Sequence, residues 1–330
     1  YSGVGASTLV ITDLGNTAPV INGLSSNISL SAAAGTCAAV ATWTAPTTSD
    51  DQTCSVTLTS NFNSGASFPV GVTTVTYTAT DVQGLVTTGS FTVTVTDSQL
   101  PTITAPSNVT VNANSSCNAT GVALGTPVTA DNCTVASVSN NAPATFPLGV
   151  TTVTWTVTDG VGNTATATQT VTVVDVTNPT ITAPANVSVN ANSSCNATGV
   201  ALGTPVTADN CSVASVTSNA PATFPLGVTT VTWIVTDGAG LTATATQTVT
   251  VVDATNPTIT APANVSVNAN SSCNATGVAL GTPVTADNCS VASVTSNAPA
   301  TFPLGVTTVT WTVTDGAGNT ATATQTVTVV

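Results

Sequence analysis

The 330-residue chain contains no lysine, arginine or histidine, and its thirteen acidic residues are all aspartate, so its formal charge is −13. Nucleic-acid binding depends on Lys and Arg neutralising phosphates, and docking on anionic membranes needs the same cations. The sequence also has no run near the 18 apolar residues of a spanning helix. We therefore expect no nucleic-acid partner and no direct membrane insertion of this segment.

The missing residue types also speak against catalysis. Without His, Lys or Glu the usual general bases are absent, and no Ser or Cys has a basic partner to activate it. Only an Asp pair or a metal site could carry out chemistry, so we predict that the chain is not an enzyme. It also lacks Met and any basic, apolar signal segment, which is typical of a mature or excerpted stretch.

Internal repetition at one fixed period organises the rest of the sequence. Proline, cysteine, aspartate and tryptophan recur at this period, for example Pro101, Pro179 and Pro257. The first unit is a diverged copy. We predict that residues 1–18 hold the last strand of a preceding repeat and the seam, the junction that joins it to the next repeat. Repeats then follow at 19–97, 98–175, 176–253 and 254–330.

Alternation with a period of two predicts strands within each repeat. In "VTTVTWTVTD" (150–159) Val and Trp alternate with Thr, and "TATATQTVTVV" (164–174) alternates likewise. Breakers such as "FPLG" (146–149) arrive at short intervals, and no helical stripe appears. The prediction is all-β: tandem immunoglobulin-like antiparallel sandwiches of about seven strands in two sheets. Their expected core anchors, for which carbohydrate stacking is the alternative, are Trp43, Tyr77, Trp155, Trp233 and Trp311.

Eight cysteines fall two to a repeat at short spacing, with none of the close CxxC pairs of structural zinc sites. Local disulfides are the simpler interpretation, and they imply an oxidising, exported location. In the chain-entropy model a short loop of this kind contributes about 3 kcal/mol. The predicted pairs are Cys37–Cys54, Cys117–Cys133, Cys195–Cys211 and Cys273–Cys289.

Several blocks together resemble the hyalin repeat, or HYR, family. They are "CAAVATWTAPTTSDDQTC" (37–54), "FPVGVTTVTYTATDVQG" (68–84) and "FTVTVTD" (91–97), and later repeats keep the Cys pair, "DNC" and "TDGAGN". The resemblance implies an immunoglobulin-like sandwich in an extracellular protein concerned with adhesion. Near-identical units without basic residues also resemble giant Bacteroidota surface adhesins, including gliding-motility adhesins exported by the type IX system.

The seams between repeats carry the only plausible metal chemistry. Ca²⁺ binds carboxylates and backbone carbonyls, and such ions can stiffen extracellular arrays. An Asp that ends a strand is also commonly just a turn former, and the nearby Pro favours a stiff joint without any metal. The candidate ligands are seam residues Asp97, Asp175 and Asp253, with turn residues Asp159, Asp237 and Asp315 if the fold brings them near.

Three functions remain open. The first is the stalk or shaft of a long cell-surface adhesin, holding an adhesive part away from the cell, because near-identical units suit a spacer. The second is a self-assembling filament subunit, because Thr/Val edges without Lys are prone to pair with other copies. The third is a module that binds a glycan or another surface protein.

Overall fold

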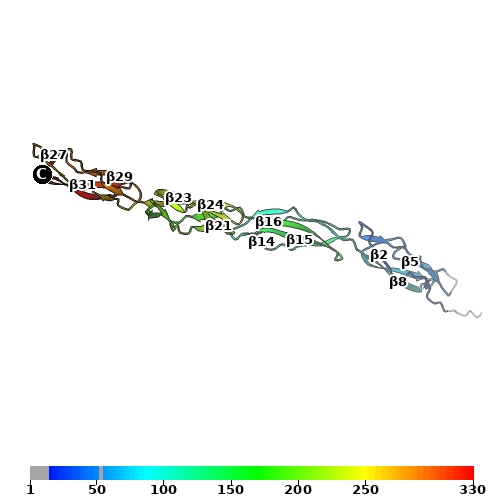
Figure 1. Cartoon of the computed structure of the whole chain (residues 1–330). Coiled ribbons are helices and arrows are strands. Elements are labelled where there is room, and N and C mark those ends of the chain that lie inside the picture. Colours follow the sequence, from blue (N-terminus) through cyan, green and yellow to red (C-terminus); the bar gives the residue numbers. More distant parts are fainter. Residues whose placement is uncertain (1–14, 52–54) are drawn as a thin grey trace, which may run out of the picture. The chain divides into compact units, whose positions relative to one another are not determined.

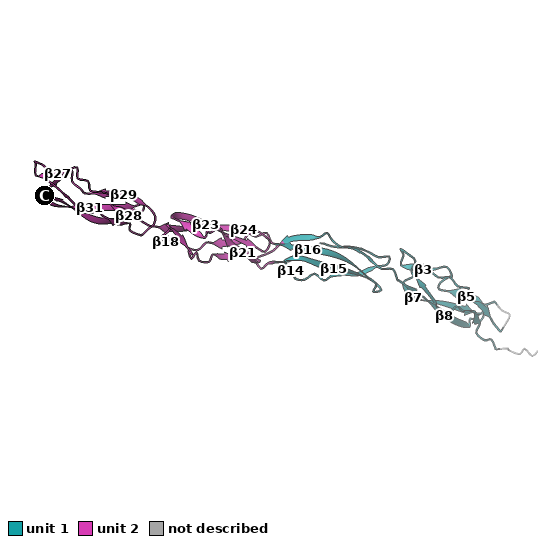
Figure 2. Ribbon diagram, in the orientation of Figure 1, with its two compact units in different colours: residues 1–111, 118–174 teal, residues 112–117, 175–330 magenta. Residues whose placement is uncertain are grey.

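The computed structural model describes residues 15–51 and 55–330, and every regular element in these ranges is a β-strand (Figure 1). No helix in the described part of the chain could cross a membrane. The strand expected before residue 13 lies outside the described residues. The chain forms two compact units, one of residues 1–111 and 118–174 and the other of residues 112–117 and 175–330 (Figure 2).

The first unit holds the strands of two repeats. The first repeat contains β1 (Val20–Asn22), β2 (Ile28–Ser31), β3 (Ala38–Val40), β4 (Thr47–Ser49), β5 (Thr57–Ser60), β6 (Ser67–Pro69), β7 (Gly71–Thr80) and β8 (Val86–Thr96). The second contains β9 (Thr102–Thr104), β10 (Val109–Asn112), β11 (Asn118–Thr120), β12 (Val128–Ala130), β13 (Val135–Asn140), β14 (Thr145–Pro147), β15 (Gly149–Asp159) and β16 (Thr164–Val174).

The second unit repeats the same pattern twice. The third repeat contains β17 (Thr180–Thr182), β18 (Val187–Asn190), β19 (Asn196–Thr198), β20 (Val206–Ala208), β21 (Val213–Ser218), β22 (Thr223–Pro225), β23 (Gly227–Asp237) and β24 (Thr242–Val252). The fourth contains β25 (Thr258–Thr260), β26 (Val265–Val267), β27 (Asn274–Thr276), β28 (Val284–Ala286), β29 (Val291–Ser296), β30 (Thr301–Pro303), β31 (Gly305–Asp315) and β32 (Thr320–Val329).

Each repeat is a sandwich of one four-stranded sheet and two strand pairs. In the third repeat the sheet order is β18-β24-β23-β21, and β17–β20 and β19–β22 form the pairs. The long hairpin β23–β24 is antiparallel, as the alternation predicts, whereas β18 runs parallel to β24. The structure thus has eight strands per repeat rather than about seven, and one pairing in the sheet departs from the antiparallel prediction.

The core lies between the four-stranded sheet and the strand pairs. In the third repeat Val231, Val249 and Val251 of the sheet pack against Ala197 and Phe224 of β19 and β22. Every second residue of the long hairpin points inward, because side chains alternate across a strand. This alternation places Val in the core and Thr on the outer face.

The aromatic residues named above contribute to these cores. Trp155 and Tyr77 are buried, while Trp233 and Trp311 are half-buried and pack against the clusters of their own repeats. Trp43 packs edge-on against Phe91, with ring centroids 5.2 Å apart, and its Nε1 donates a hydrogen bond to the Tyr77 hydroxyl.

A buried glutamine ties the two layers together. The Gln169 side chain is fully buried, accepts a hydrogen bond from Trp155 Nε1 and donates to the backbone carbonyls of Ser107 and Leu124. Gln247 and Gln325 make equivalent bonds in the later repeats. Alternation alone places position 169 on the inner face but gives no reason for a polar residue there.

Replacing Gln169 should therefore destabilise its repeat strongly. Gln169→Leu keeps a similar volume but leaves a buried indole N–H and two partly buried carbonyls without this partner, at a cost of about 3 kcal/mol. Urea unfolding followed by tryptophan fluorescence measures the change. The exposed Gln83→Ala is the control, and we expect it to shift stability by less than about 0.5 kcal/mol.

Candidate functional site at the repeat junctions

The disulfides join neighbouring repeats, so the predicted pairing within repeats is wrong for the described cysteines. The bonds are Cys37–Cys133, Cys117–Cys211 and Cys195–Cys289, with Cα atoms 4.6–4.7 Å apart. Each bond joins the first cysteine of one repeat to the "DNC" cysteine of the next. Cys273 is exposed and free, and Cys54 lies outside the described residues.

The fold explains why the two cysteines of one repeat do not meet. In the third repeat Ala191 N–H donates to Val252 O, which places the loop with Cys195 at the end of β24. Gly238 N–H donates to Ser212 O, which places Cys211 beside the turn that precedes β24. The eleven residues of β24 separate these positions by roughly 36 Å. A disulfide needs Cα atoms within about 7 Å, so the two cysteines of this repeat cannot pair with each other.

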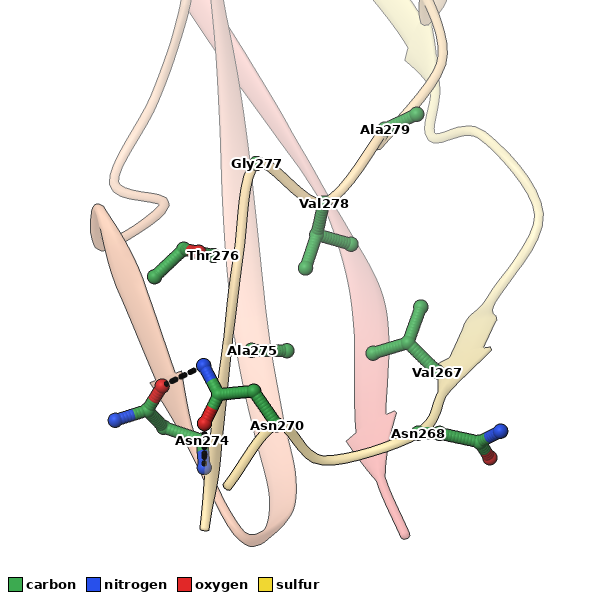
Figure 3. Close-up of a pocket in the computed structure, with 9 residues that line it drawn as sticks. All are labelled: Val267, Asn268, Asn270, Asn274, Ala275, Thr276, Gly277, Val278 and Ala279. Carbon is green, nitrogen blue, oxygen red and sulfur yellow. Dashed lines mark hydrogen bonds between the residues drawn. The ribbon is translucent and has the colours of Figure 1, made fainter. Parts of the chain in front are cut away.

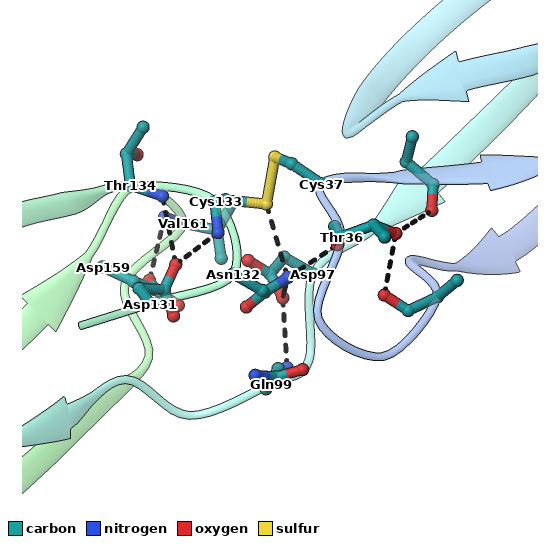
Figure 4. The surroundings of a disulfide bond; sticks show 12 residues. Thr36, Cys37, Asp97, Gln99, Asp131, Asn132, Cys133, Thr134, Asp159 and Val161 are labelled. Carbon is teal, nitrogen blue, oxygen red and sulfur yellow. Dashed lines mark hydrogen bonds between the residues drawn. A yellow bond between two sulfur atoms is a disulfide. The ribbon is translucent and has the colours of Figure 1, made fainter.

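Polar side chains surround the first disulfide (Figure 4). Asn132 Nδ2 donates to Thr36 O at 2.9 Å and to Asp97 Oδ1 at 3.2 Å, so it bridges two repeats. Asp131 Oδ2 accepts the backbone N–H groups of Cys133 and Thr134 and thereby caps the loop. In the "DNC" element, the Asp therefore caps the loop, the Asn bridges two repeats, and the Cys forms the disulfide.

The second unit contains the same arrangement twice. Asn210 Nδ2 donates to Asn114 O and Asn288 Nδ2 donates to Asn192 O, at 3.2 and 3.3 Å. Asp209 Oδ2 and Asp287 Oδ2 cap their loops as Asp131 does. The regular recurrence of "DNC" is the sequence signal that could have indicated this role. Recurrence alone does not distinguish a bridge between repeats from an Asp that caps a turn.

The fold gathers carboxylates at these junctions. Asp175, Asp209 and Asp237 each offer an oxygen within 4.8 Å of the others, and so do Asp253, Asp287 and Asp315. In the first unit the corresponding group is Asp97, Asp131 and the disulfide-bonded Cys133, without Asp159. The seam and turn aspartates named from the sequence thus meet at two junctions. The aspartates of "DNC" complete these groups, although they were not among the candidate ligands named from the sequence.

Many oxygens at these junctions are buried without a hydrogen-bond partner. At each junction they include one oxygen of the seam Asp and one of the "DNC" Asp, together with Oδ1 of the "DNC" Asn. Asp237 Oδ2 is a fourth, at the junction where Leu241 stands in place of Asn163 and Asn319. Asn319 Nδ2 donates to Asp315 Oδ2 at 2.8 Å, a bond that Leu241 cannot make.

Comparison with known proteins identifies the repeats. The HYR domain profile matches residues 15–95, 96–173, 174–251 and 252–329, which together cover nearly the whole chain. The chain belongs to the HYR domain family. The matched segments fall in step with the four sets of eight strands.

Relatives of these HYR repeats include two sea urchin hyalins. Hyalin of Strongylocentrotus purpuratus is 33% identical over 344 residues, covering 98% of this chain and 29% of the relative. Hyalin of Lytechinus variegatus is 33% identical over 316 residues, covering 90% and 59%. The chain therefore spans less than two thirds of the length of either relative.

Solved structures similar to the HYR array include cadherin ectodomains. The protocadherin GammaB4 extracellular domain aligns over 94% of this chain and 66% of its own length, with 15% identity and a TM-score of 0.33. Drosophila N-cadherin EC1-4 aligns over 93% and 99%, with 10% identity and a TM-score of 0.29.

An open hollow of about 280 Å³ lies on the fourth HYR repeat (Figure 3). Val267, Val278 and Ala275 line it beside Asn270 and Asn274, and Asn270 Nδ2 donates to Asn274 Oδ1 at 2.7 Å. No titratable side chain is among its lining residues. The hollow therefore offers no group that could act as a general acid or base.

The turn aspartate of the first HYR repeat gives stability a dependence on pH. The side chain of Asn16 donates to Asp81 Oδ2 at 2.6 Å, and the backbone N–H groups of Gln83 and Leu85 donate to Oδ1. The Asn16 bond is the largest influence on the pKa of Asp81; together with the backbone bonds it lowers that pKa below 3.8, although burial raises it.

Asn16→Ala should therefore lower stability at neutral pH and have less effect in acid. A lowered folded-state pKa gives stabilisation that is present above the ordinary pKa and lost as pH falls through the folded value. We expect the difference in urea midpoint between Asn16→Ala and the parent to be full at pH 7 and to shrink below about pH 4. The control Asn22→Ala removes an exposed bond to Ser49 Oγ that involves no titrating group. A pH-independent difference for Asn16→Ala would contradict the role assigned to Asp81.

Proposed function

We propose that this chain is a structural repeat region of an extracellular adhesion protein, a stalk or shaft that holds an adhesive part away from the cell. The proposed role is non-catalytic. We place it outside the cell because disulfides such as the three among the described residues persist in oxidising compartments. Two hyalins are 33% identical to this chain, over 344 and 316 residues. They give no support to a gliding-motility or type IX context, which we leave out of the proposed role.

The observation that carries this proposal is the overlap of the disulfide loops. Cys117 precedes Cys133 in the chain, and Cys195 precedes Cys211, so each loop begins before the previous loop ends. Tension applied to the two ends passes from one disulfide to the next through the short segments 117–133 and 195–211. Most of the first three sandwich cores lies outside this path. Such a covalent bypass lets a shaft transmit force without unfolding these cores.

A self-assembling filament subunit is the second candidate, and Cys273 favours it. Cys273 has a positive φ of 53°, close to the 56° of Cys117 and Cys195. Those two cysteines form disulfides with a neighbouring repeat. An exposed thiol in this position is available for a disulfide with another chain, because the three "DNC" cysteines of this chain are already paired. A glycan- or protein-binding module has no comparable support among the described residues.

Light scattering coupled to size-exclusion chromatography separates the shaft from the filament. A shaft segment should elute as a single species of 32.1 kDa in both the parent and Cys273→Ser. Covalent filaments in the parent that disappear in Cys273→Ser would favour the assembly role. Filaments that persist in Cys273→Ser would point to pairing through exposed strand edges and would overturn the spacer role.

A further inference from the structure

We infer that Asp175, Asp209 and Asp237 of the second unit form a Ca²⁺ site. This inference concerns cation binding at one junction and does not depend on the proposed shaft role. If it fails, the disulfide connections between repeats remain as described.

The hydrogen bonds leave one oxygen of each carboxylate free. Asp175 Oδ1 accepts Thr177 N–H at 3.0 Å, and Asp209 Oδ2 accepts Cys211 N–H at 2.8 Å. Asp237 Oδ1 accepts the N–H groups of the turn that follows it. The other oxygen of each carboxylate is buried and has no partner, and the Asp237 side chain as a whole is only 2% exposed. The turns thus fix the three carboxylates while leaving their remaining oxygens available.

A bound cation would offset this concentration of charge. One oxygen from each of the three carboxylates lies within 4.8 Å of the others, and like charges at this range repel strongly away from water. The chain contains no Lys, Arg or His that could pair with them. Ca²⁺ binds oxygen ligands at about 2.3–2.6 Å, so two ligands on one ion are separated by at most about 5 Å. The spacing of the group fits that limit.

The equivalent group in the fourth repeat provides an internal comparison. Asp253, Asp287 and Asp315 are gathered in the same way, but Asn319 Nδ2 donates to Asp315 Oδ2. This amide supplies the partner that Asp237 Oδ2 lacks, because position 241 is Leu. The junction with Leu241 should therefore bind Ca²⁺ more tightly than the junction with Asn319.

Calorimetric titration of the oxidised full chain with CaCl₂ in metal-free buffer at neutral pH tests the inference. We expect saturable binding of one strong equivalent, with a weaker response to Mg²⁺, which demands stricter octahedral geometry. Asp175→Asn, which keeps the Oδ1 acceptor, should raise the dissociation constant by on the order of tenfold or more. Without Ca²⁺ the same variant should unfold at the same temperature as the parent or higher, because it removes repulsion.

Two reciprocal variants and one control complete the experiment. Leu241→Asn should weaken the strong site, and Asn319→Leu should create a second strong equivalent. Asp51→Asn, which makes the same charge change outside the carboxylate groups, should leave binding unchanged. No saturable binding up to about 10 mM Ca²⁺, beyond the weakest extracellular sites, would overturn the inference. So would equal binding by Asp175→Asn and Asp51→Asn in the folded state.

Discussion

Pulled by its two ends, the oxidised chain should extend to no more than about 380 Å, even when every loaded segment has unfolded. The covalent path runs from the N-terminus to Cys37, crosses to Cys133 and runs back to Cys117. It then crosses to Cys211, runs back to Cys195 and crosses to Cys289. This path contains only about 110 of the 330 residues, each spanning roughly 3.5 Å when extended.

Other disulfide arrangements predict very different lengths. Pairing within each repeat would remove only short loops and leave roughly 265 residues extensible, or about 930 Å. Full reduction should release the whole chain, with an extended length of about 1,150 Å. Single-molecule force spectroscopy with and without reductant measures these lengths directly. A limit of about 930 Å in the oxidised chain would contradict disulfides between repeats.

Removing one inter-repeat disulfide should cost a large part of the stability of the repeats that it joins. The Cys195–Cys289 bond closes a loop of 94 residues. In the chain-entropy model such a loop contributes about 4.7 kcal/mol, compared with about 3 kcal/mol for a loop within one repeat. We therefore expect Cys195→Ala combined with Cys289→Ala to lower the free energy of unfolding by about 4–5 kcal/mol in urea titrations.

The control for this experiment is Cys273→Ser. Cys273 is exposed and free, so its replacement should change stability by less than about 0.5 kcal/mol. Pairing within repeats predicts instead that both variants are destabilised. Cys273→Ser would then break a bond to Cys289 and destabilise the chain, and the double variant would break two bonds at once.

The fold was largely predictable because it depends on local alternation. The hairpin of β15 and β16 follows from Val and Thr in strict alternation around the "DGVGN" turn, and the register pairs Trp155 with Ala167 across it. The parallel pairing of β18 with β24 was not predictable, because alternation does not encode strand direction. The splitting of the second layer into two short pairs likewise leaves no periodic signal.

The junctions were only partly predictable, because they form between repeats. Asp175 and Asp237 were identified as candidates from their positions at a seam and a turn, but their meeting depends on how one repeat follows another. The pairing of the cysteines also depends on how one repeat follows another. The short spacing of Cys195 and Cys211 in the sequence fits a local loop. The strand that separates them, roughly 36 Å long, becomes apparent only when the sheet order is known.

A non-reducing peptide map tests the inter-repeat disulfides most directly. A protease that cleaves before aspartate places all eight cysteines in separate peptides, and the sequence differences between repeats give these peptides distinct masses. We predict linked pairs of 13–49 with 131–158, 97–130 with 209–236, and 175–208 with 287–314. A link between 97–130 and 131–158, or between 175–208 and 209–236, would contradict the covalent connection between repeats on which the account depends.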